Sequence, residues 1–161
     1  HLSDCRITPC RECLGCFKGG VCVIADEMQG IYPRLLEADI IILASPIFFY
    51  GITGWAKAMV DRIQALWARK YVLHDPALGK EGVKRRGFFI SVGGTKGQLM
   101  FEGAILTARY FFDAFNTDYT GELLFREVDA CGDIRENSEA LPQAFAVGRN
   151  LVSDLRNTRC V

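Results

Sequence analysis

The stretch that most constrains the fold is the run 40–44, Ile-Ile-Ile-Leu-Ala, which is apolar at every position. A strand with one face in water alternates apolar and polar residues, whereas a strand buried on both faces of a parallel sheet is apolar throughout. Residues 55–67 follow with apolar side chains at helical spacing, and this predicts an amphipathic helix. Its expected inner face consists of Met59, Ile63, Leu66 and Trp67. The sequence therefore predicts a strand-loop-helix unit of an open α/β sheet, in which ligands bind at the carboxyl ends of the strands.

The loop of this unit is rich in aromatic residues. It consists of Ser45, Pro46, Ile47, Phe48, Phe49, Tyr50 and Gly51. Three consecutive aromatic side chains at such an edge suit a flat ligand, and they would equally well cap the core, so the residues alone leave both interpretations open.

A second apolar strand, predicted over 87–92, repeats this pattern. The turn that follows it consists of Gly93, Gly94, Thr95, Lys96 and Gly97. The glycines allow a ligand to approach the backbone closely, and Thr95 or Lys96 could donate a hydrogen bond to it. An ordinary strand-to-helix turn is the alternative.

After this turn, the chain predicts two more helices and a third strand. A helix is expected over 99–115, a strand over 119–125, and a last helix capped by Asn137 or Ser138. The expected inner stripe of the last helix is Leu141, Phe145, Gly148, Val152 and Leu155.

Strands that alternate with helices predict a parallel sheet with right-handed crossovers, in one three-layer α/β domain over 1–161. The strand 40–44 reads as one with neighbours on both sides, yet only 1–4 could supply an earlier strand. We therefore expect an N-terminally incomplete domain that lacks a βαβ portion.

A cysteine-rich loop is predicted over 5–25. Its residues Cys10, Cys13, Cys16 and Cys22 have the spacing C-x2-C-x2-C-x5-C. Thiolates this close together could hold one [4Fe-4S] cluster, although ferredoxins use a shorter last gap. Bare thiols, zinc and a disulfide remain alternatives, and a four-thiolate zinc site normally uses two separated pairs.

Composition excludes several classes of function. The chain of 161 residues has 19 Lys and Arg against 19 Asp and Glu, so it lacks the basic field of a nucleic-acid-binding protein. No apolar stretch is long enough for a membrane span. Seven cysteines in a domain of this size favour reduced thiols, and we expect a cytoplasmic protein.

Taken together, these motifs resemble the NADPH-dependent FMN reductase and iron-sulfur flavoprotein family of the flavodoxin-like fold. The similar segments are 9–22 with its cysteines, 26–28, 45–53 with Lys57, Asp61 and Arg62, 91–97, and 128–134. The family opens with a strand and a Ser/Gly-rich loop that holds the FMN phosphate, and no such loop is found here. We therefore expect this chain to hold flavin weakly or not at all.

The resemblance implies that 45–51 and 93–97 contact FMN, with NAD(P)H as co-substrate and an unknown final acceptor. The expected function is thus an NAD(P)H-dependent FMN oxidoreductase, which requires no side-chain acid or base for hydride transfer. The alternative is an electron carrier with a [4Fe-4S] cluster and a partner such as ferredoxin. An interaction domain without catalysis is a third hypothesis. The resemblance also implies a homo-oligomer, a dimer or tetramer.

Overall fold

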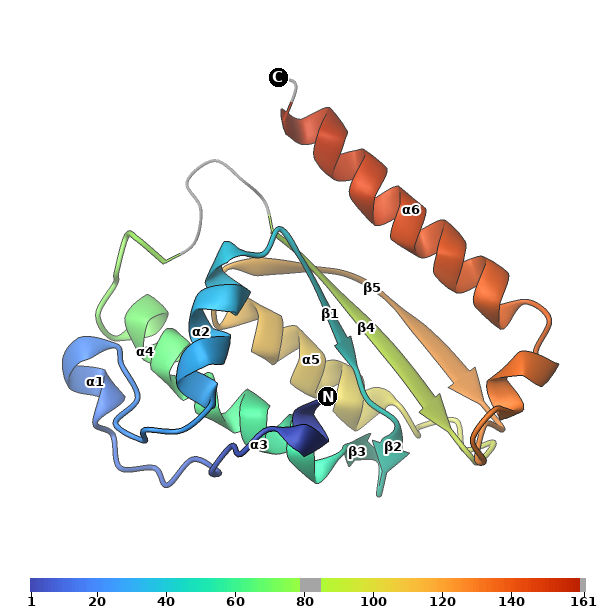
Figure 1. Ribbon diagram of the computed structural model, residues 1–161, viewed down its shortest axis with the longest axis horizontal. Helices are drawn as coiled ribbons and strands as arrows, with labels where there is room; N and C mark the ends of the chain where they lie inside the picture. Colours follow the sequence, from blue (N-terminus) through green and yellow to red (C-terminus); the bar gives the residue numbers. More distant parts are fainter. Residues whose placement is uncertain (79–84, 160–161) are drawn as a thin grey trace.

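A computed structural model describes residues 1–78 and 85–159, with side chains as far as Leu155 (Figure 1). Its main sheet has three parallel strands, β1 (Ile40–Ala44), β4 (Arg85–Gly93) and β5 (Thr117–Arg126), in the order β1-β4-β5. The predicted parallel sheet is therefore confirmed, and its second and third strands are each longer than expected.

Four helices pack against one face of this sheet and enclose the core. They are α2 (Met28–Glu37), α3 (Gly54–Arg62), α4 (Gln64–Tyr71) and α5 (Glu102–Asp113). Phe89 of β4 and Phe112 of α5 are fully buried here, and Phe112 packs in a cluster of phenylalanine rings with Phe111 and Phe115. Burial of such aromatic surface is the main source of stability in a domain of this size.

The opposite face of the sheet carries α6 (Ala140–Arg159). Arg85 and Arg86 point to opposite faces of β4, and Arg86 forms a 2.7 Å ion pair with Asp154 of α6. Leu151 of the same helix is buried. The expected cap at Asn137 or Ser138 is not in the cap position, because the helix begins at Ala140; Asn137 instead accepts the backbone N–H of Glu139 in the turn before it.

The predicted inner stripe of this last helix is wrong in part. Leu141, Phe145 and Val152 are exposed, whereas Gly148 and Leu155 are half-buried. The buried stripe passes through Leu151, because only a narrow line of the helix faces the sheet. The spacing of apolar residues in the sequence does not distinguish those that face the sheet from their exposed neighbours on the same helix.

Two expectations for the strand-loop-helix unit also need correction. The helix expected over 55–67 is two helices that break at Ile63, and Trp67 is 37% exposed, although Met59, Ile63 and Leu66 are buried as predicted. The strand β1 is not buried on both faces in the described chain, where it pairs with β4 alone and Ile42 is half exposed.

The expected loops contain short regular elements. The loop 45–51 includes a hairpin of β2 (Ile47–Phe48) and β3 (Gly51–Ile52). The cysteine-rich loop contains α1 (Cys16–Gly19), and the 3-10 turns η1 (Leu2–Asp4) and η2 (Asp133–Glu136) complete the described elements. Among residues 1–78 and 85–159, no helix combines the length and apolar character that crossing a bilayer requires.

Candidate functional site

The aromatic hairpin stands at the carboxyl end of β1 (Figure 1). Its turn residues Phe49 and Tyr50 have φ of 49° and 63°, a left-handed conformation that costs a residue with a Cβ about 1 kcal/mol or more. Phe48 and Tyr50 are well exposed, and Phe49 is as exposed as a residue can be, at 105%. The turn therefore holds three aromatic side chains away from the core, so the core-capping interpretation is wrong for them.

Ser45 fastens this hairpin to the rest of the molecule. Its hydroxyl donates to the Pro46 carbonyl at 3.0 Å and accepts from the Thr53 N–H at 3.0 Å. Its carbonyl accepts the Ser91 hydroxyl at 2.7 Å. Thr53 in turn caps α3 by accepting from the Ala56 N–H. The buried Ser45 thus joins β1, β4 and the start of α3.

The second predicted loop, 93–97, lies against the hairpin. A Cβ on Gly97 would lie 3.3 Å from the Tyr50 hydroxyl oxygen, and a Cβ on Gly93 would lie 2.6 Å from the Met100 sulfur. Thr95 donates to the same sulfur at 3.2 Å, and Lys96 forms an exposed ion pair with Glu127. The structure therefore brings together the two loops that the sequence predicted to share a ligand.

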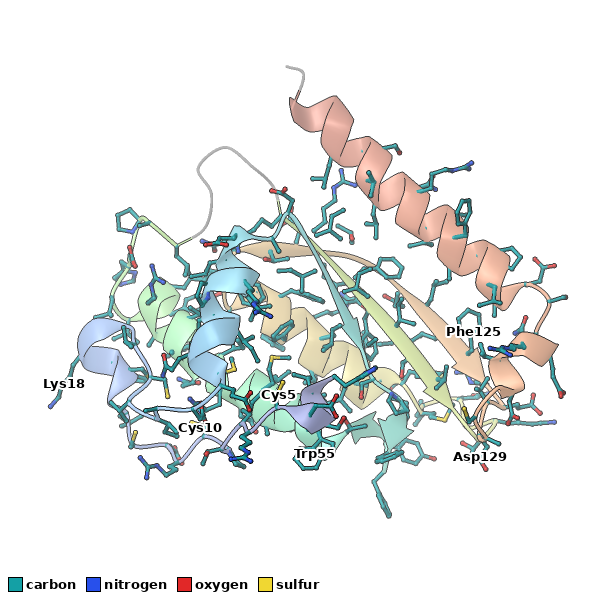
Figure 2. The ribbon with its side chains drawn as sticks, viewed as in Figure 1. Cys5, Cys10, Lys18, Trp55, Phe125 and Asp129 are labelled. Carbon is teal, nitrogen blue, oxygen red and sulfur yellow. The ribbon has the colours of Figure 1, made fainter. Side chains whose placement is uncertain are left out.

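A third segment, after β5, joins the same edge. The Val128 N–H donates to the Gly93 carbonyl at 3.2 Å, and a Cβ on Gly94 would lie 2.6 Å from an Asp129 carboxylate oxygen. Asp133 holds this segment by accepting from the N–H groups of Asp129 and Ala130. Figure 2 shows Asp129 at the carboxyl end of β5. Three loops thus converge where parallel sheets of this type bind ligands.

The four cysteines of the predicted motif line a separate cavity of about 440 Å³. Cys10 and Cys13 are exposed, whereas Cys16 and Cys22 are half-buried. Burial raises the pKa of the Cys16 thiol, and the nearby Cys22, Cys10 and Cys13 act in the same direction. In the part of the chain that the structure describes, no three His, Cys, Asp or Glu side chains are already arranged to hold a metal ion. The four thiols line one cavity, but their sulfur atoms are not arranged around a common metal position.

A buried ion pair borders this cavity. Arg62 lines it, and the Arg62 side chain forms a 2.7 Å ion pair with Asp26 while wholly inaccessible to solvent. Hydrogen bonds from Arg62 lower the pKa of Asp26 to about 2, against the effect of burial. Asp61 pairs instead with Lys57 on the surface. Asp61 and Arg62 are adjacent in the sequence, but no local pattern reveals that Arg62 pairs with Asp26, 36 residues away.

One buried donor of Arg62 is left without a partner in the described part of the chain. The Nε of Arg62 is buried and has no hydrogen-bond acceptor among the described residues. Buried polar groups in proteins nearly always have a partner.

The order of the strands, the helices on both faces and the converging loops define a flavodoxin-like α/β protein. Comparison with known proteins identifies the family. The sequence profile of the NADPH-dependent FMN reductase family matches residues 1–108, and the chain belongs to this family.

Individual relatives agree with this assignment. An iron-sulfur flavoprotein of Archaeoglobus fulgidus is 36% identical over 104 residues, which are 63% of this chain and 49% of the relative. An iron-sulfur flavoprotein of Methanosarcina thermophila is 30% identical over 95 residues, 59% of this chain and 45% of the relative. The chain thus spans about half the length of the curated relatives it matches.

Solved structures show the same fold. The Trp repressor binding protein of Bacillus subtilis has a TM-score of 0.57 and 27% identity, over 75% of this chain and 71% of that one. A flavone reductase has a TM-score of 0.66 and 19% identity, over 98% of this chain and 51% of that one.

Proposed function

We propose that the protein is an FMN-dependent oxidoreductase that takes reducing equivalents from NAD(P)H and passes them to an acceptor not yet identified. The observation that carries this proposal is the convergence of three loops, one of which is the exposed aromatic hairpin. Family membership supports FMN as the cofactor, because the matching family is described as NADPH-dependent FMN reductase. A bound FMN would accept a hydride from the nicotinamide and release its electrons to the acceptor.

The residues of the three loops would bind and orient the isoalloxazine ring. Phe48 and Phe49 offer exposed apolar faces, and the backbone N–H groups of 47–50 would donate to the polar edge of the ring. Gly94 and Gly97 leave the backbone open to close approach, and Thr95 and Lys96 are exposed beside them. The proposal assigns no general acid or base, because hydride transfer between two stacked rings needs none.

The direct test is FMN binding by the purified chain, followed by quenching of flavin fluorescence, and NADPH and NADH oxidation in its presence. Wild-type protein should bind FMN, with the low affinity expected of a chain without the Ser/Gly-rich phosphate loop, and should oxidise one of the two nucleotides. Phe49→Ala should weaken binding by about fivefold, because aromatic stacking contributes about 1 kcal/mol. Phe145→Ala removes an equally apolar exposed ring from α6 and is the matched control. Unchanged FMN fluorescence with wild-type protein would refute the proposal.

A second candidate is an electron carrier that holds a [4Fe-4S] cluster on Cys10, Cys13, Cys16 and Cys22. It is favoured by the cavity that these four thiols share. Protein reconstituted without oxygen should then contain about four iron atoms per chain, and Cys13→Ser should lower this content. Cys131→Ser, an exposed cysteine outside the motif, is the control. Iron-free protein that oxidises NAD(P)H well would reject the carrier and leave the first proposal standing.

A further inference from the structure

The side chain of Arg126 connects the ends of two neighbouring strands at the edge where the loops converge. Arg126 is the last residue of β5, and it lies opposite Gly93, the last residue of β4, in the parallel ladder. Its Nε donates to the Gly97 carbonyl at 3.3 Å, and one terminal nitrogen donates to the Gln98 carbonyl at 3.1 Å. Arg126 therefore holds two consecutive carbonyls at the end of the loop 93–97.

The guanidinium that makes these bonds is itself held in place. Its central carbon lies 5.2 Å from the ring centre of Phe101, which is buried. The next residue, Glu127, has a left-handed φ of 60° and forms a 3.1 Å ion pair with Lys96 of the same loop. A planar guanidinium can lie on a ring and donate from its edge at the same time, which a lysine ammonium cannot do. The ring and the two carbonyls together fix the position of the Arg126 side chain.

This arrangement also sets the direction of two backbone donors. In a trans peptide group the C=O and the N–H point in opposite directions, and the described residues have no cis peptide. Because the carbonyls of Gly97 and Gln98 point at Arg126, the N–H groups of Gln98 and Leu99 point away from it. Neither N–H donates to an acceptor among the described residues, and both residues are exposed. Two donors next to the aromatic hairpin are therefore available to a ligand.

We infer that Arg126 is a positioning residue of the proposed flavin site: by holding the carbonyls of Gly97 and Gln98, it presents the N–H groups of Gln98 and Leu99 to the polar edge of the isoalloxazine ring. This inference rests on the first proposed function. The donors suit such a ring, whose polar edge carries acceptor oxygens and nitrogens, and the Tyr50 hydroxyl lies beside Gly97 on the same loop. Arg126 acts through the backbone and does not itself contact the flavin.

The first measurement needs no flavin. Arg126→Met keeps an apolar side chain over Phe101 and removes both donors. In the flavin-free protein, this change should lower the backbone ¹⁵N order parameters of Gly97 and Gln98 from about 0.85, the value of a rigid backbone, to below about 0.6. Arg135→Met is the matched control, because it removes an exposed arginine from η2 whose side chain has no hydrogen bond or ion pair among the described residues. That variant should keep the wild-type order parameters.

The second measurement is flavin affinity, by quenching of flavin fluorescence. Arg126→Met should bind FMN about tenfold more weakly than wild type, because the ring must then order a loop that Arg126 otherwise holds. Riboflavin has the same ring and no phosphate, so its affinity should fall by the same factor. Arg135→Met should bind both flavins as wild type does. A loss confined to FMN would show that Arg126 binds the phosphate, and it would overturn the positioning role.

The third measurement follows the amide protons of Gln98 and Leu99 in the wild-type protein during a flavin titration. Hydrogen bonding to the ring should move both signals downfield, which a purely structural role of Arg126 would not do. Signals that stay in place while flavin binds would overturn the inference, and this measurement decides if Arg126→Met fails to fold. Unchanged order parameters in Arg126→Met would equally overturn it. Wild-type protein that binds neither flavin refutes the proposed function, whereas the order parameters still report whether Arg126 holds the loop.

Discussion

Gly103 of α5 lies directly against the backbone of Tyr50, so that a Cβ on Gly103 would be 2.8 Å from the Tyr50 carbonyl oxygen. The position of Gly103 in the first turn of α5 thereby supports a hairpin whose turn has an unfavourable conformation. A left-handed Phe-Tyr pair persists only where its surroundings hold it in place. The glycine contact is one such support, and it leaves the aromatic side chains free to meet a ligand.

Gly103→Ala should therefore destabilise the protein by about 1–3 kcal/mol, because the new methyl group meets backbone atoms that cannot move aside cheaply. The measurement is urea unfolding followed by circular dichroism. Gly30→Ala is the control, since Gly30 lies in the first turn of α2 with nothing within 4 Å of an added Cβ. That variant should stabilise the protein by about 0.5–1 kcal/mol through helix propensity. Equal effects of the two changes would contradict the contact.

Phe49→Asn should raise stability and lower FMN affinity together. Asparagine tolerates a φ of 49° better than phenylalanine, and Phe49 has no buried surface to lose, so a gain of about 0.5–1 kcal/mol is expected. Phe49→Ala loses the ring without relieving the backbone. Both variants should weaken FMN binding in fluorescence titrations, but only the asparagine should shift the urea midpoint upward. A stability gain from alanine would show that the backbone conformation is not the cause.

The sheet and the converging loops could be predicted from the sequence because both depend on the residue pattern of short, continuous segments. The runs 40–44 and 87–92 are continuous and apolar, and each is followed by a turn rich in glycine or aromatic residues. Since the carboxyl ends of parallel strands share one edge, their turns had to meet. The Tyr50 hydroxyl lies beside Gly97, so the two turns do lie together as expected.

Other features depend on contacts that no local pattern encodes. The β2–β3 hairpin lacks the Asn-Gly or Gly signal of a two-residue turn, because Phe49 and Tyr50 occupy the left-handed positions. The pair of Arg62 and Asp26 joins helix α3 to a loop far away in the sequence. Trp67 has the spacing of a core residue, yet it packs at the surface between Phe17 and Tyr71.

Stability should fall in acid as Asp26 becomes protonated. Its pKa is lowered from 3.8 to about 2 by Arg62, so its contribution is present above pH 4 and is lost as the pH falls toward 2. Because the ordinary value exceeds the folded value, the unfolded chain binds the proton first, and the contribution is about 2 kcal/mol. Urea unfolding at pH 7, 4 and 3 measures this loss.

Asp26→Asn should abolish that part of the pH dependence and lower stability at pH 7 by about 3 kcal/mol, because it leaves a buried guanidinium without its counter-ion. Asp61→Asn is the matched control, since Asp61 pairs with Lys57 at the surface, where an ion pair contributes about 0–1 kcal/mol. An Asp26→Asn variant as stable as Asp61→Asn at pH 7 would show that the pair contributes little.

The four thiols of the motif should react with iodoacetamide in two groups. Cys10 and Cys13 are exposed, whereas Cys16 and Cys22 are half-buried, and burial raises the pKa of Cys16. Since the thiolate is the nucleophile, a raised pKa and restricted access both slow the reaction. In reduced, metal-free protein at pH 8, mass spectrometry should find Cys10 and Cys13 modified before Cys16. Addition of urea should remove the difference, because unfolding exposes all four thiols equally. Cys16 reacting as fast as Cys10 in the folded chain would mean that the loop is open in solution.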